Sequence, residues 1–289
     1  MRKFFTFIRS YIRFEEFGFF TFFLLIVLSF FNSAPANSHT LKLEKLLLFF
    51  TFFSTVVVIS ISYQSLRVVR NWLPILFFLS IYLNLQHLID ILNPNHYDEI
   101  LIRVDQVLFG VQPSLWMERL ISSPLTDFLT ICYSFFYFYP LPLAVILYLR
   151  KGGFGDFRNY ATSIILCFYL GFVGYLLLPA YGPRFSLHYA QELKGSFFSE
   201  NLRAKLDHME STKKDVFPSL HNAIVLLVLL FAHKHQRKIF YILLPLGLGI
   251  FLSTVYLRYH YGIDVICGWI LGLICFRLGA DVNRWWKIS

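Results

Sequence analysis

Charged residues are scarce in this sequence. Only 15% of its 289 residues are Asp, Glu, Lys or Arg, whereas soluble globular domains have about 25%. Hydrophobic residues make up 57%, and they gather in runs of about 18–20 residues, the length that crosses the hydrocarbon core of a bilayer. This composition excludes an ordinary soluble domain and predicts an all-α, polytopic membrane protein.

Cysteine is scarce too, and no C-x-x-C pair occurs. The four cysteines lie inside apolar runs and are expected to be small core residues: Cys132, Cys167, Cys267 and Cys275. A soluble basic domain is also lacking, so Lys and Arg in cytoplasmic loops explain the net charge of +9 better than nucleic-acid binding does. The apolar run after Glu16 lacks a clear small-residue cleavage site, which favours an uncleaved helix over a signal peptide.

The apolar runs predict about eight membrane-spanning helices. Their approximate ranges are 17–31, 46–62, 72–92, 126–149, 160–178, 219–232, 239–257 and 262–280. Pro140 and Pro142 are expected to kink the fourth helix, which neighbouring helices tolerate within a membrane. In the third, Asn84, His87 and Asp90 recur every three residues, and either substrate binding or ordinary interhelical hydrogen bonding explains them.

Basic residues gather in segments that lie, by this count of spans, on one face of the membrane. They are Arg2, Lys3, Arg9, Arg13, Arg67, Arg70, Arg150, Lys151, Arg158, Lys234, Arg237, Lys238, Arg284 and Lys287. The loops on the opposite face contain interspersed acids, among them Asp98 and Asp105. Because Lys and Arg are enriched on the cytoplasmic side, we take the basic face as cytoplasmic, in a cell or inner membrane.

Two loops on the non-cytoplasmic face are long. The first covers residues 93–125, and its apolar residues recur at helical spacing, which predicts a helix lying in the membrane interface. These residues are Leu101, Val104, Val107, Leu108 and Val111. The second loop, residues 179–218, is polar, and long loops of this kind often act as lids or binding segments.

Four polar residues fall at the start or end of apolar runs on this same non-cytoplasmic face. Arg184 follows the fifth run, His221 begins the sixth, and His260 and Asp264 begin the eighth. His260 and Asp264 are four residues apart, so on a helix they share one face. A carboxylate bonded to one imidazole nitrogen fixes the tautomer and exposes the other nitrogen as a nucleophile. His221 is then available as a general acid.

This set of residues favours phosphoryl transfer on a lipid. Arg184 and Arg258 are suited to binding a phosphoryl group through planar, bidentate contacts. Pro218 suits the first turn of the sixth helix, which would aim the backbone N–H groups near Ser219 towards an anion. Two histidines and a carboxylate are also able to ligate a metal ion, and that alternative remains open here.

The motifs resemble those of the type 2 phosphatidic acid phosphatase (PAP2) superfamily. The segment Phe217-Pro218-Ser219-Leu220-His221 is similar to its second signature, and the segment from Ser253 through His260 to Asp264, followed by Gly268, is similar to its third. The stretches 105–114 and 181–184 resemble the branch that contains inositol phosphorylceramide synthases. The resemblance covers roughly residues 100–275.

The resemblance implies a role for each matched residue. His260 would form a phosphohistidine intermediate, His221 would protonate the leaving group, and Asp264 would orient His260. The substrate would be a membrane lipid, with no metal ion and no cofactor. Residues 1–92 would then be N-terminal transmembrane helices, the first two additional to a six-helix core, and residues 93–280 would be the catalytic region.

Two positions depart from the family's pattern. Leu177 stands where the first signature has a lysine, and Thr254 stands where the third usually has an arginine. Phosphate binding is therefore expected to depend on Arg184, Arg258 and Ser219.

Three functional classes remain open from the sequence. The first is a lipid phosphatase, which takes a phosphomonoester with water as acceptor, or an inositol phosphorylceramide synthase-like phosphotransferase, which moves a head group from a phospholipid donor to a lipid or sugar hydroxyl. The second is a membrane transporter or lipid flippase, although the sequence has neither an internal repeat nor a pair of interrupted helices in corresponding halves. The third is a non-catalytic membrane scaffold, which would not need the two histidines and the carboxylate.

Overall fold

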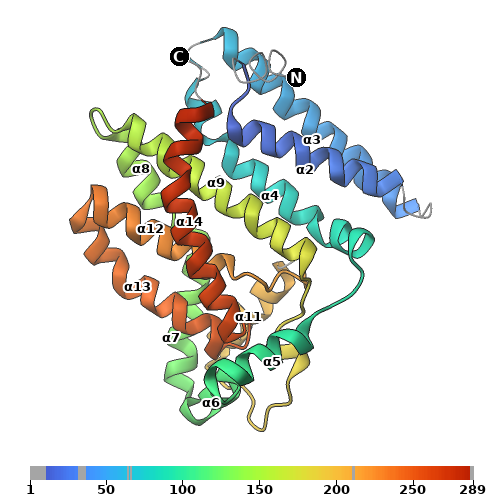
Figure 1. The fold of residues 1–289 in the computed structure, drawn as a ribbon, viewed down its shortest axis with the longest axis vertical. Coiled ribbons are helices and arrows are strands. Elements are labelled where there is room, and N and C mark those ends of the chain that lie inside the picture. The colour runs from blue at the N-terminus through green and yellow to red at the C-terminus, as the bar shows by residue number, and fades with distance from the viewer. Residues whose placement is uncertain (1–10, 32–36, 64, 66, 210–211, 287–289) are drawn as a thin grey trace. The chain divides into compact units, whose positions relative to one another are not determined.

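The computed structural model describes residues 11–31, 37–63, 65, 67–209 and 212–286, and Figure 1 shows its ribbon. These residues form helices and no strand, apart from an isolated bridge between Ala180 and Asp215. The all-α prediction is therefore confirmed. The basic residues Arg2, Lys3, Arg9 and Lys287 lie outside the described residues.

The chain divides into two compact units, one of residues 1–94 with 282–289 and one of residues 95–281. The second unit contains most of the helices. They are α5 (Asp98–Phe109), α6 (Pro113–Trp116), η2 (Met117–Leu120), α7 (Ser123–Ser134), η3 (Phe135–Tyr137), α8 (Leu141–Leu149), α9 (Phe154–Leu177), α10 (Pro183–Ser186), α11 (Phe197–Met209), α12 (Leu220–His235), α13 (Arg237–Tyr256) and α14 (Gly262–Trp286), whose last turn belongs to the first unit.

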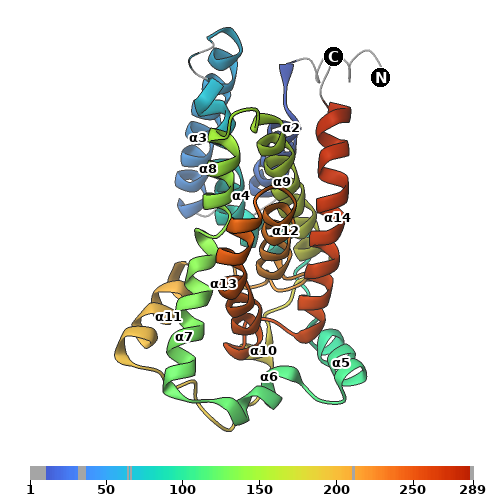
Figure 2. The ribbon, with the colours of Figure 1, turned by 90° about the vertical axis from the view of Figure 1, so that its left-hand side faces the viewer.

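Helix α12 lies in the core of the second unit, between α9 and α13 (Figure 2). Five of its apolar side chains are completely buried, namely Ala223, Ile224, Val225, Leu227 and Val228. Helix α14 packs closely on the start of α12 because two glycines leave room for the backbone. A Cβ at Gly268 would lie 2.4 Å from the Ser219 carbonyl oxygen, and one at Gly272 would lie 2.6 Å from that of Ala223. Small residues of this kind permit close helix contacts in membranes.

Four helices are individually long and apolar enough to cross a membrane, namely α4, α9, α13 and α14. The segments Ser123–Tyr137 and Leu141–Leu149 meet the same criteria together and are bent by 41°. Pro140 and Pro142 lie at this break, so the expected kink is confirmed. Proline has no backbone N–H, so a helical hydrogen bond is lost at its position and the helix bends. The polytopic bundle is thus confirmed, although four to five spans, rather than eight, meet these criteria within the described ranges.

The predicted helix in the loop 93–125 is confirmed as α5, but its amphipathic character is unusual. The outward side carries exposed apolar residues, including Val107 and Leu108. The inward side contains Leu101 together with two buried carboxylates, Asp98 and Asp105. The acids therefore face the protein, although the sequence had suggested only loop charges.

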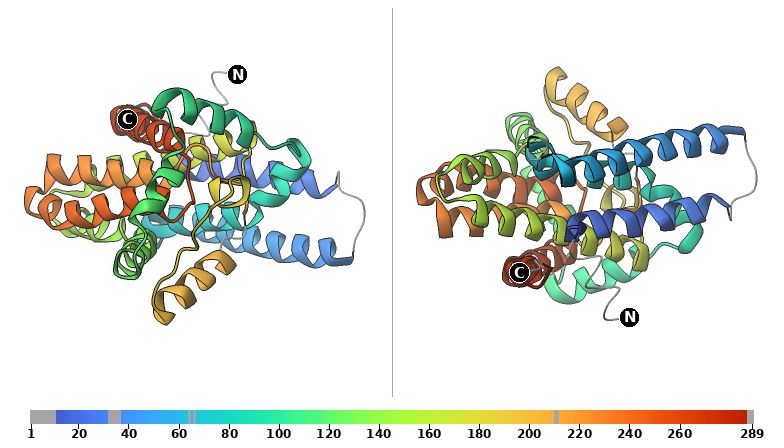
Figure 3. Two further views of the ribbon diagram at one scale, coloured as in Figure 1. Left: turned by 90° about the horizontal axis from the view of Figure 1, so that it is seen from below. Right: turned by 90° about the horizontal axis from the view of Figure 1, so that it is seen from above.

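The first unit contains α2 (Phe14–Phe31), α3 (Asn37–Ser62) and α4 (Arg67–Leu92), and α2 and α3 run alongside each other (Figure 3). Phe19 stacks on Phe77 with ring centroids 4.5 Å apart, which joins α2 to α4. The buried carboxylate of Glu16 accepts hydrogen bonds from Arg70 Nε at 2.5 Å and Nη2 at 2.6 Å. This bidentate pairing compensates each charge for its loss of water.

The polar residues of the third apolar run make ordinary helix contacts. Asn84 Nδ2 donates to the Ser80 carbonyl at 2.9 Å, Gln86 Nε2 donates to Asp90, and the His87 ring stacks on Phe30 at 4.1 Å. Both hydrogen bonds lie within α4, and of these three contacts only the ring contact joins α4 to α2. The interhelical hydrogen bonding that the sequence left as one explanation therefore stays a prediction.

Candidate active site

His221 is positioned by the N-terminus of α12. The helix begins at Leu220, and Ser219 is its N-cap, with Oγ accepting from Asn222 N at 3.4 Å and from Asn222 Nδ2 at 2.9 Å. A serine side chain commonly satisfies the free N–H groups at this position. The expectation that Pro218 lies in the first turn is therefore wrong, because Ser219 takes the cap and Pro218 precedes it.

The backbone N–H of Ser219 has a partner within the protein. It donates to the carbonyl oxygen of Asp264 at 3.1 Å, so this N–H does not face an anion as we expected. The contact instead ties the start of α12 to the first turn of α14. A phosphate-binding role of the Ser219 hydroxyl stays a prediction.

His260 lies in the short connection between α13 and α14, two residues before α14 begins. The carbonyl oxygen of Thr254 accepts from the backbone N–H groups of Tyr259 and His260, both at 3.0 Å. Asp264 reaches back from the first turn of α14, and its Oδ2 accepts from the backbone N–H of Tyr261 at 2.8 Å. The loop, and not a shared helix face as predicted, therefore aligns His260 with Asp264.

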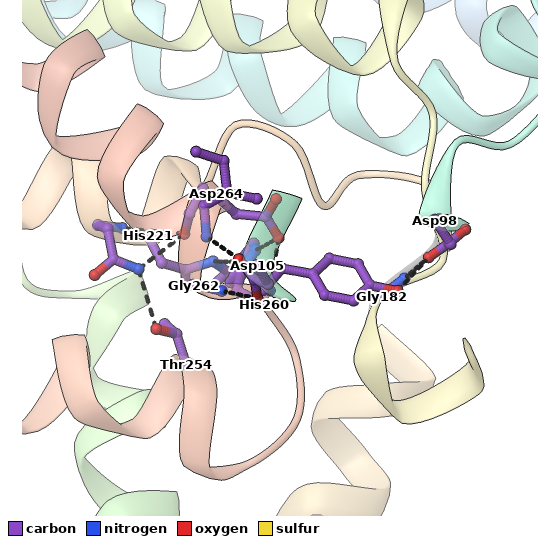
Figure 4. A network of polar contacts seen from close by, with 12 residues as sticks. Asp98, Asp105, Gly182, His221, Thr254, His260, Gly262 and Asp264 are labelled. Carbon is purple, nitrogen blue, oxygen red and sulfur yellow. Dashed lines mark hydrogen bonds and ion pairs between the residues drawn. The ribbon is translucent and has the colours of Figure 1, made fainter. Parts of the chain in front are cut away.

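Asp264, His260 and His221 form a line of contacts (Figure 4). His260 Nδ1 lies 3.5 Å from Asp264 Oδ2, and His260 Nε2 lies 3.4 Å from His221 Nδ1. These distances exceed those of strong hydrogen bonds, as is common in catalytic groups before substrate binds. The structure thus brings the three residues together as predicted, with Asp264 and His221 on opposite nitrogens of His260.

Several buried polar atoms of the site lack a hydrogen-bond partner within the described part of the chain, among them His260 Nδ1, Asp264 Oδ1 and the remaining nitrogen of His221. His221 Nε2 is buried and has no hydrogen-bond partner among the residues that the structure describes. Buried polar atoms in proteins are almost always hydrogen-bonded, and exceptions require an explanation. This nitrogen is therefore the atom of His221 that is available to a substrate oxygen.

Aromatic rings from α7 and η3 hold the His221 imidazole in place. Tyr133 stacks on His221 at 4.8 Å and on Tyr259 at 4.4 Å, and Phe136 lies 4.1 Å from His221 between ring centroids. The rings restrict the orientation of the imidazole. Sequence reasoning missed Tyr133 and Phe136, because nothing distinguishes them from other aromatic residues in an apolar helix.

Arg184 is held close to the same loop. Its backbone N–H donates to the Arg258 carbonyl at 3.0 Å, and its Nη1 donates to Asp207 Oδ1 at 2.5 Å. The guanidinium carbon lies 4.6 Å from the centroid of the Tyr259 ring. Gly182, two residues earlier, has φ of 90°, and a Cβ there would lie 2.8 Å from the Tyr259 carbonyl oxygen. Only glycine fits this approach.

Arg258 makes its contacts with the outer loop and η2. Its Nη2 donates to the Gln191 carbonyl at 2.5 Å and lies 3.5 Å from Glu118 Oε1, and its guanidinium carbon is 3.7 Å from the Tyr189 ring centroid. These partners neutralise and orient the guanidinium. A phosphate-binding role of Arg258 therefore stays a prediction, and it requires phosphate to compete with Glu118.

The environment of His260 favours its neutral form. Burial lowers the pKa of His260 well below the ordinary value of 6.5, and the neighbouring His221 and the positive charge of Arg184 lower it further. The Val216 backbone carbonyl acts in the opposite direction by stabilising the protonated ring. A nucleophilic imidazole needs an unprotonated nitrogen, and these surroundings maintain one at neutral pH.

Two carboxylates that the sequence reasoning missed hold the loop around His260. Asp105 accepts from the backbone N–H groups of Gly262 and Ile263, and Asp98 accepts from the N–H of Gly182 (Figure 4). A signal existed in the sequence, because Asp98 and Asp105 are seven residues apart and so share a helix face. They share it with Leu101, on the face that turns inward.

The two departures from the family pattern have structural explanations. Thr254 is fully buried, and its Oγ1 accepts from Asn222 Nδ2 at 3.0 Å, which links α13 to α12 (Figure 4). Leu177 is the last residue of α9 and is exposed. Neither position contributes a charge to the site.

The metal-ion alternative is not supported by the geometry. Within the described part of the chain, no group of three or more His, Cys, Asp or Glu side chains is arranged to hold a metal ion. Asp264 and His221 lie on opposite nitrogens of His260, so the three groups do not converge on one point as ligands of a single ion must.

Comparison with known proteins gives one match. A family model described as the PAP2 superfamily matches residues 99–278, more than half of the chain. The matched range includes Arg184, His221, Arg258, His260 and Asp264. No curated protein and no solved structure matches the chain.

Proposed function

Because the chain belongs to the PAP2 superfamily, we propose that it is a membrane enzyme that transfers a phosphoryl group from a lipid phosphate through a phosphohistidine at His260. Superfamily membership supports phosphatase or phosphotransferase chemistry in general. The observation that carries the proposal is the line from Asp264 through His260 to His221. This arrangement supports a different role for each nitrogen of His260.

In the first step, the lone pair of His260 Nε2 attacks phosphorus, and the bond from phosphorus to the leaving oxygen breaks. His221 gives its Nε2 proton to that oxygen, which leaves as an alcohol; the negative charge of the bound phosphate stabilises the protonated imidazole that this step requires. Asp264 holds the Nδ1 proton of His260 and stabilises the positive charge of the phosphorylated ring, as the aspartate does in a serine-protease triad.

In the second step, an acceptor hydroxyl attacks the phosphorus of phosphohistidine. His221, now neutral, takes the proton of that hydroxyl, the P–N bond breaks, and His260 returns to its neutral form. Water as the acceptor gives a phosphatase. A lipid or sugar hydroxyl gives a phosphotransferase. An inositol phosphorylceramide synthase-like reaction would start from a phosphodiester donor, so that His260 carries the phosphorylated head group in place of a phosphoryl group.

Arg184 is the residue best placed to stabilise the phosphoryl oxygens. Its charge already acts on His260, and a guanidinium binds phosphate oxygens in a planar, bidentate manner. Electrostatic stabilisation of this kind is usually the largest single contribution to catalysis. The distribution of Lys and Arg supports a site on the non-cytoplasmic face. Superfamily membership favours enzymatic chemistry over the transporter or flippase alternative.

Product analysis tests the proposal. Purified protein in mixed micelles receives labelled phosphatidic acid and labelled phosphatidylinositol, with ceramide as acceptor. Release of inorganic phosphate identifies a phosphatase, and a new lipid carrying the head group identifies a phosphotransferase. His260→Ala is expected to abolish either product, whereas His188→Ala, an exposed histidine of the outer loop, is the matched control. Turnover in His260→Ala equal to that of the wild type would overturn the proposal.

A further inference from the structure

Helix α5 buries its carboxylates and exposes its apolar residues. Asp98 and Asp105 are 2% and 0% exposed, whereas Val107 is 84% exposed. Burying a carboxylate removes its hydration, which costs a free energy on the order of several kcal/mol unless the carboxylate is fully hydrogen-bonded. The two acids must therefore have partners that compensate for this cost. Apart from the exposed His96, whose Nδ1 lies 3.4 Å from Asp98 Oδ2, their partners among the described residues belong to the segments that carry Arg184 and His260.

Asp105 caps the N-terminus of α14. Its Oδ2 accepts from Gly262 N at 2.8 Å, and its Oδ1 accepts from Ile263 N at 2.7 Å (Figure 4). The first N–H groups of a helix have no partner within the helix, and a negative charge is favoured there. Asp264 accepts from the preceding N–H group, that of Tyr261. Two carboxylates thus fix three successive backbone N–H groups immediately after His260.

Asp98 joins two segments that are far apart in the sequence. Its Oδ1 accepts from Gly182 N at 2.9 Å and from the Tyr261 hydroxyl at 2.8 Å, and its Oδ2 accepts from Tyr181 N at 3.0 Å. The first segment leads directly to Arg184, and Tyr261 directly follows His260. One carboxylate therefore sets the position of the arginine segment relative to the histidine loop.

We propose that Asp98 and Asp105 are positioning residues for the phosphoryl transfer, Asp105 for the Nε2 nucleophile of His260 and Asp98 for Arg184 relative to it. The inference rests on the proposed function, since it assigns residues to that same site. Neither carboxylate contacts the reacting atoms. Each acts through backbone N–H groups adjacent to a residue that does, and a displacement of about 1 Å in such a site costs about a hundredfold in rate.

Asp105→Asn tests the first half of the inference. The amide keeps the size of the side chain but has one acceptor oxygen, so its NH₂ group faces one of the two N–H donors. We expect phosphoenzyme formation and kcat to fall by about 10- to 100-fold, with KM changed by less than about threefold, because substrate contacts are kept. Glu99→Gln, on the exposed side of the same helix, is the matched control and is expected to behave as the wild type.

Asp98→Asn and Tyr261→Phe test the second half. Tyr261→Phe removes only the hydroxyl that donates to Asp98, so it serves also if the aspartate variants do not fold. We expect both variants to be monodisperse and to raise KM and the inhibition constant of inorganic phosphate by about three- to tenfold, because Arg184 is displaced. A merely structural role would lower thermal stability and leave these constants unchanged.

The outcomes separate this inference from the proposed function. Turnover that is lost in His260→Ala but equals that of the wild type in Asp105→Asn, Asp98→Asn and Tyr261→Phe would overturn the inference alone. A wild-type protein that releases no product from any lipid phosphate would overturn the proposed function and the inference with it.

Discussion

At the scale of single residues, the two nitrogens of His260 have different neighbours, and this difference makes a nucleophile of one of them. Asp264 lies against Nδ1, and His221 lies against Nε2. Their burial removes the competition of water for these contacts and strengthens them. We expect different kinetic effects from substitutions of Asp264, Arg184 and Asp207.

Asp264→Asn is expected to lower kcat by about 10³- to 10⁴-fold with little change in KM, because an amide presents the wrong group to Nδ1 and does not stabilise the charged ring. Steady-state kinetics on the lipid phosphate measures this effect. The control is Asp281→Asn near the other end of α14, which should leave kcat unchanged. A loss of less than about tenfold in Asp264→Asn would show that the carboxylate does not orient His260.

The pH dependence of kcat/KM follows from the environment of His260. Burial, His221 and Arg184 all lower its pKa below 6.5, so His260 stays neutral and nucleophilic until the pH falls below that value. The acidic limb of the profile should therefore lie below pH 6.5. Arg184→Ala should move the limb to higher pH because a positive charge is removed, and Arg184→Lys should leave it in place. An identical limb in all three proteins would contradict this assignment.

Asp207 binds the guanidinium of Arg184, and in the proposed function the phosphoryl group binds the same guanidinium. Its Oδ1 accepts from Arg184 Nη1 and, at 2.9 Å, from the Tyr259 hydroxyl. Asp207→Asn should lower the inhibition constant of inorganic phosphate by about three- to tenfold, because a neutral amide competes less well than a carboxylate for the arginine. Glu200→Gln on the same helix is the control. An unchanged constant in Asp207→Asn would mean that phosphate does not bind Arg184.

At the scale of helices, the site depends on how closely α14 approaches α12. The Ser219 N–H donates to the Asp264 carbonyl, and Gly268 leaves no room for a side chain at the same crossing. This contact fixes the distance between the helix that starts at His221 and the one that carries Asp264.

Gly268→Ala is expected to destabilise the protein by about 1–3 kcal/mol through overpacking, because the added Cβ would lie 2.4 Å from the Ser219 carbonyl oxygen. Thermal unfolding in detergent measures the change. Gly155→Ala in the first turn of α9 is the matched control, since a Cβ there meets nothing within 4 Å. Equal melting temperatures for the two variants would contradict the close crossing.

Helix-scale patterns also explain what the sequence allowed us to predict. Counting spans predicted that His221 and His260 lie close together, and the 3.4 Å between His260 Nε2 and His221 Nδ1 confirms it. The apolar spacing of residues 101–111 correctly predicted α5. Pro218 was wrongly predicted to lie in the first turn of α12. Proline fits both the first turn and the position before a serine cap, so the sequence alone did not decide between them. Serine resolves the ambiguity only when its side chain is seen to accept from Asn222.

At the scale of the whole molecule, the sequence predicted a polytopic helical bundle from composition alone. The number of spans was less predictable, since a helix such as α12, with 16 residues, has an apolar middle yet is shorter than a membrane crossing. The pairing of Asp105 with the start of α14 joins residues 157 positions apart. Local periodicity carries no information on such a pairing, and for this reason the contacts of Asp98 and Asp105 with the loops of the site emerged only from the structure.

The measurement that tests the central claim most directly is the identification of the phosphorylated residue. The protein in micelles is mixed with phosphatidic acid labelled in its phosphate, and the reaction is stopped at alkaline pH within one turnover. The peptides are then mapped by mass spectrometry. We predict phosphate on the His260 ring and none in His260→Ala. An active protein that carries no phosphate on His260 under these conditions would contradict the phosphohistidine mechanism.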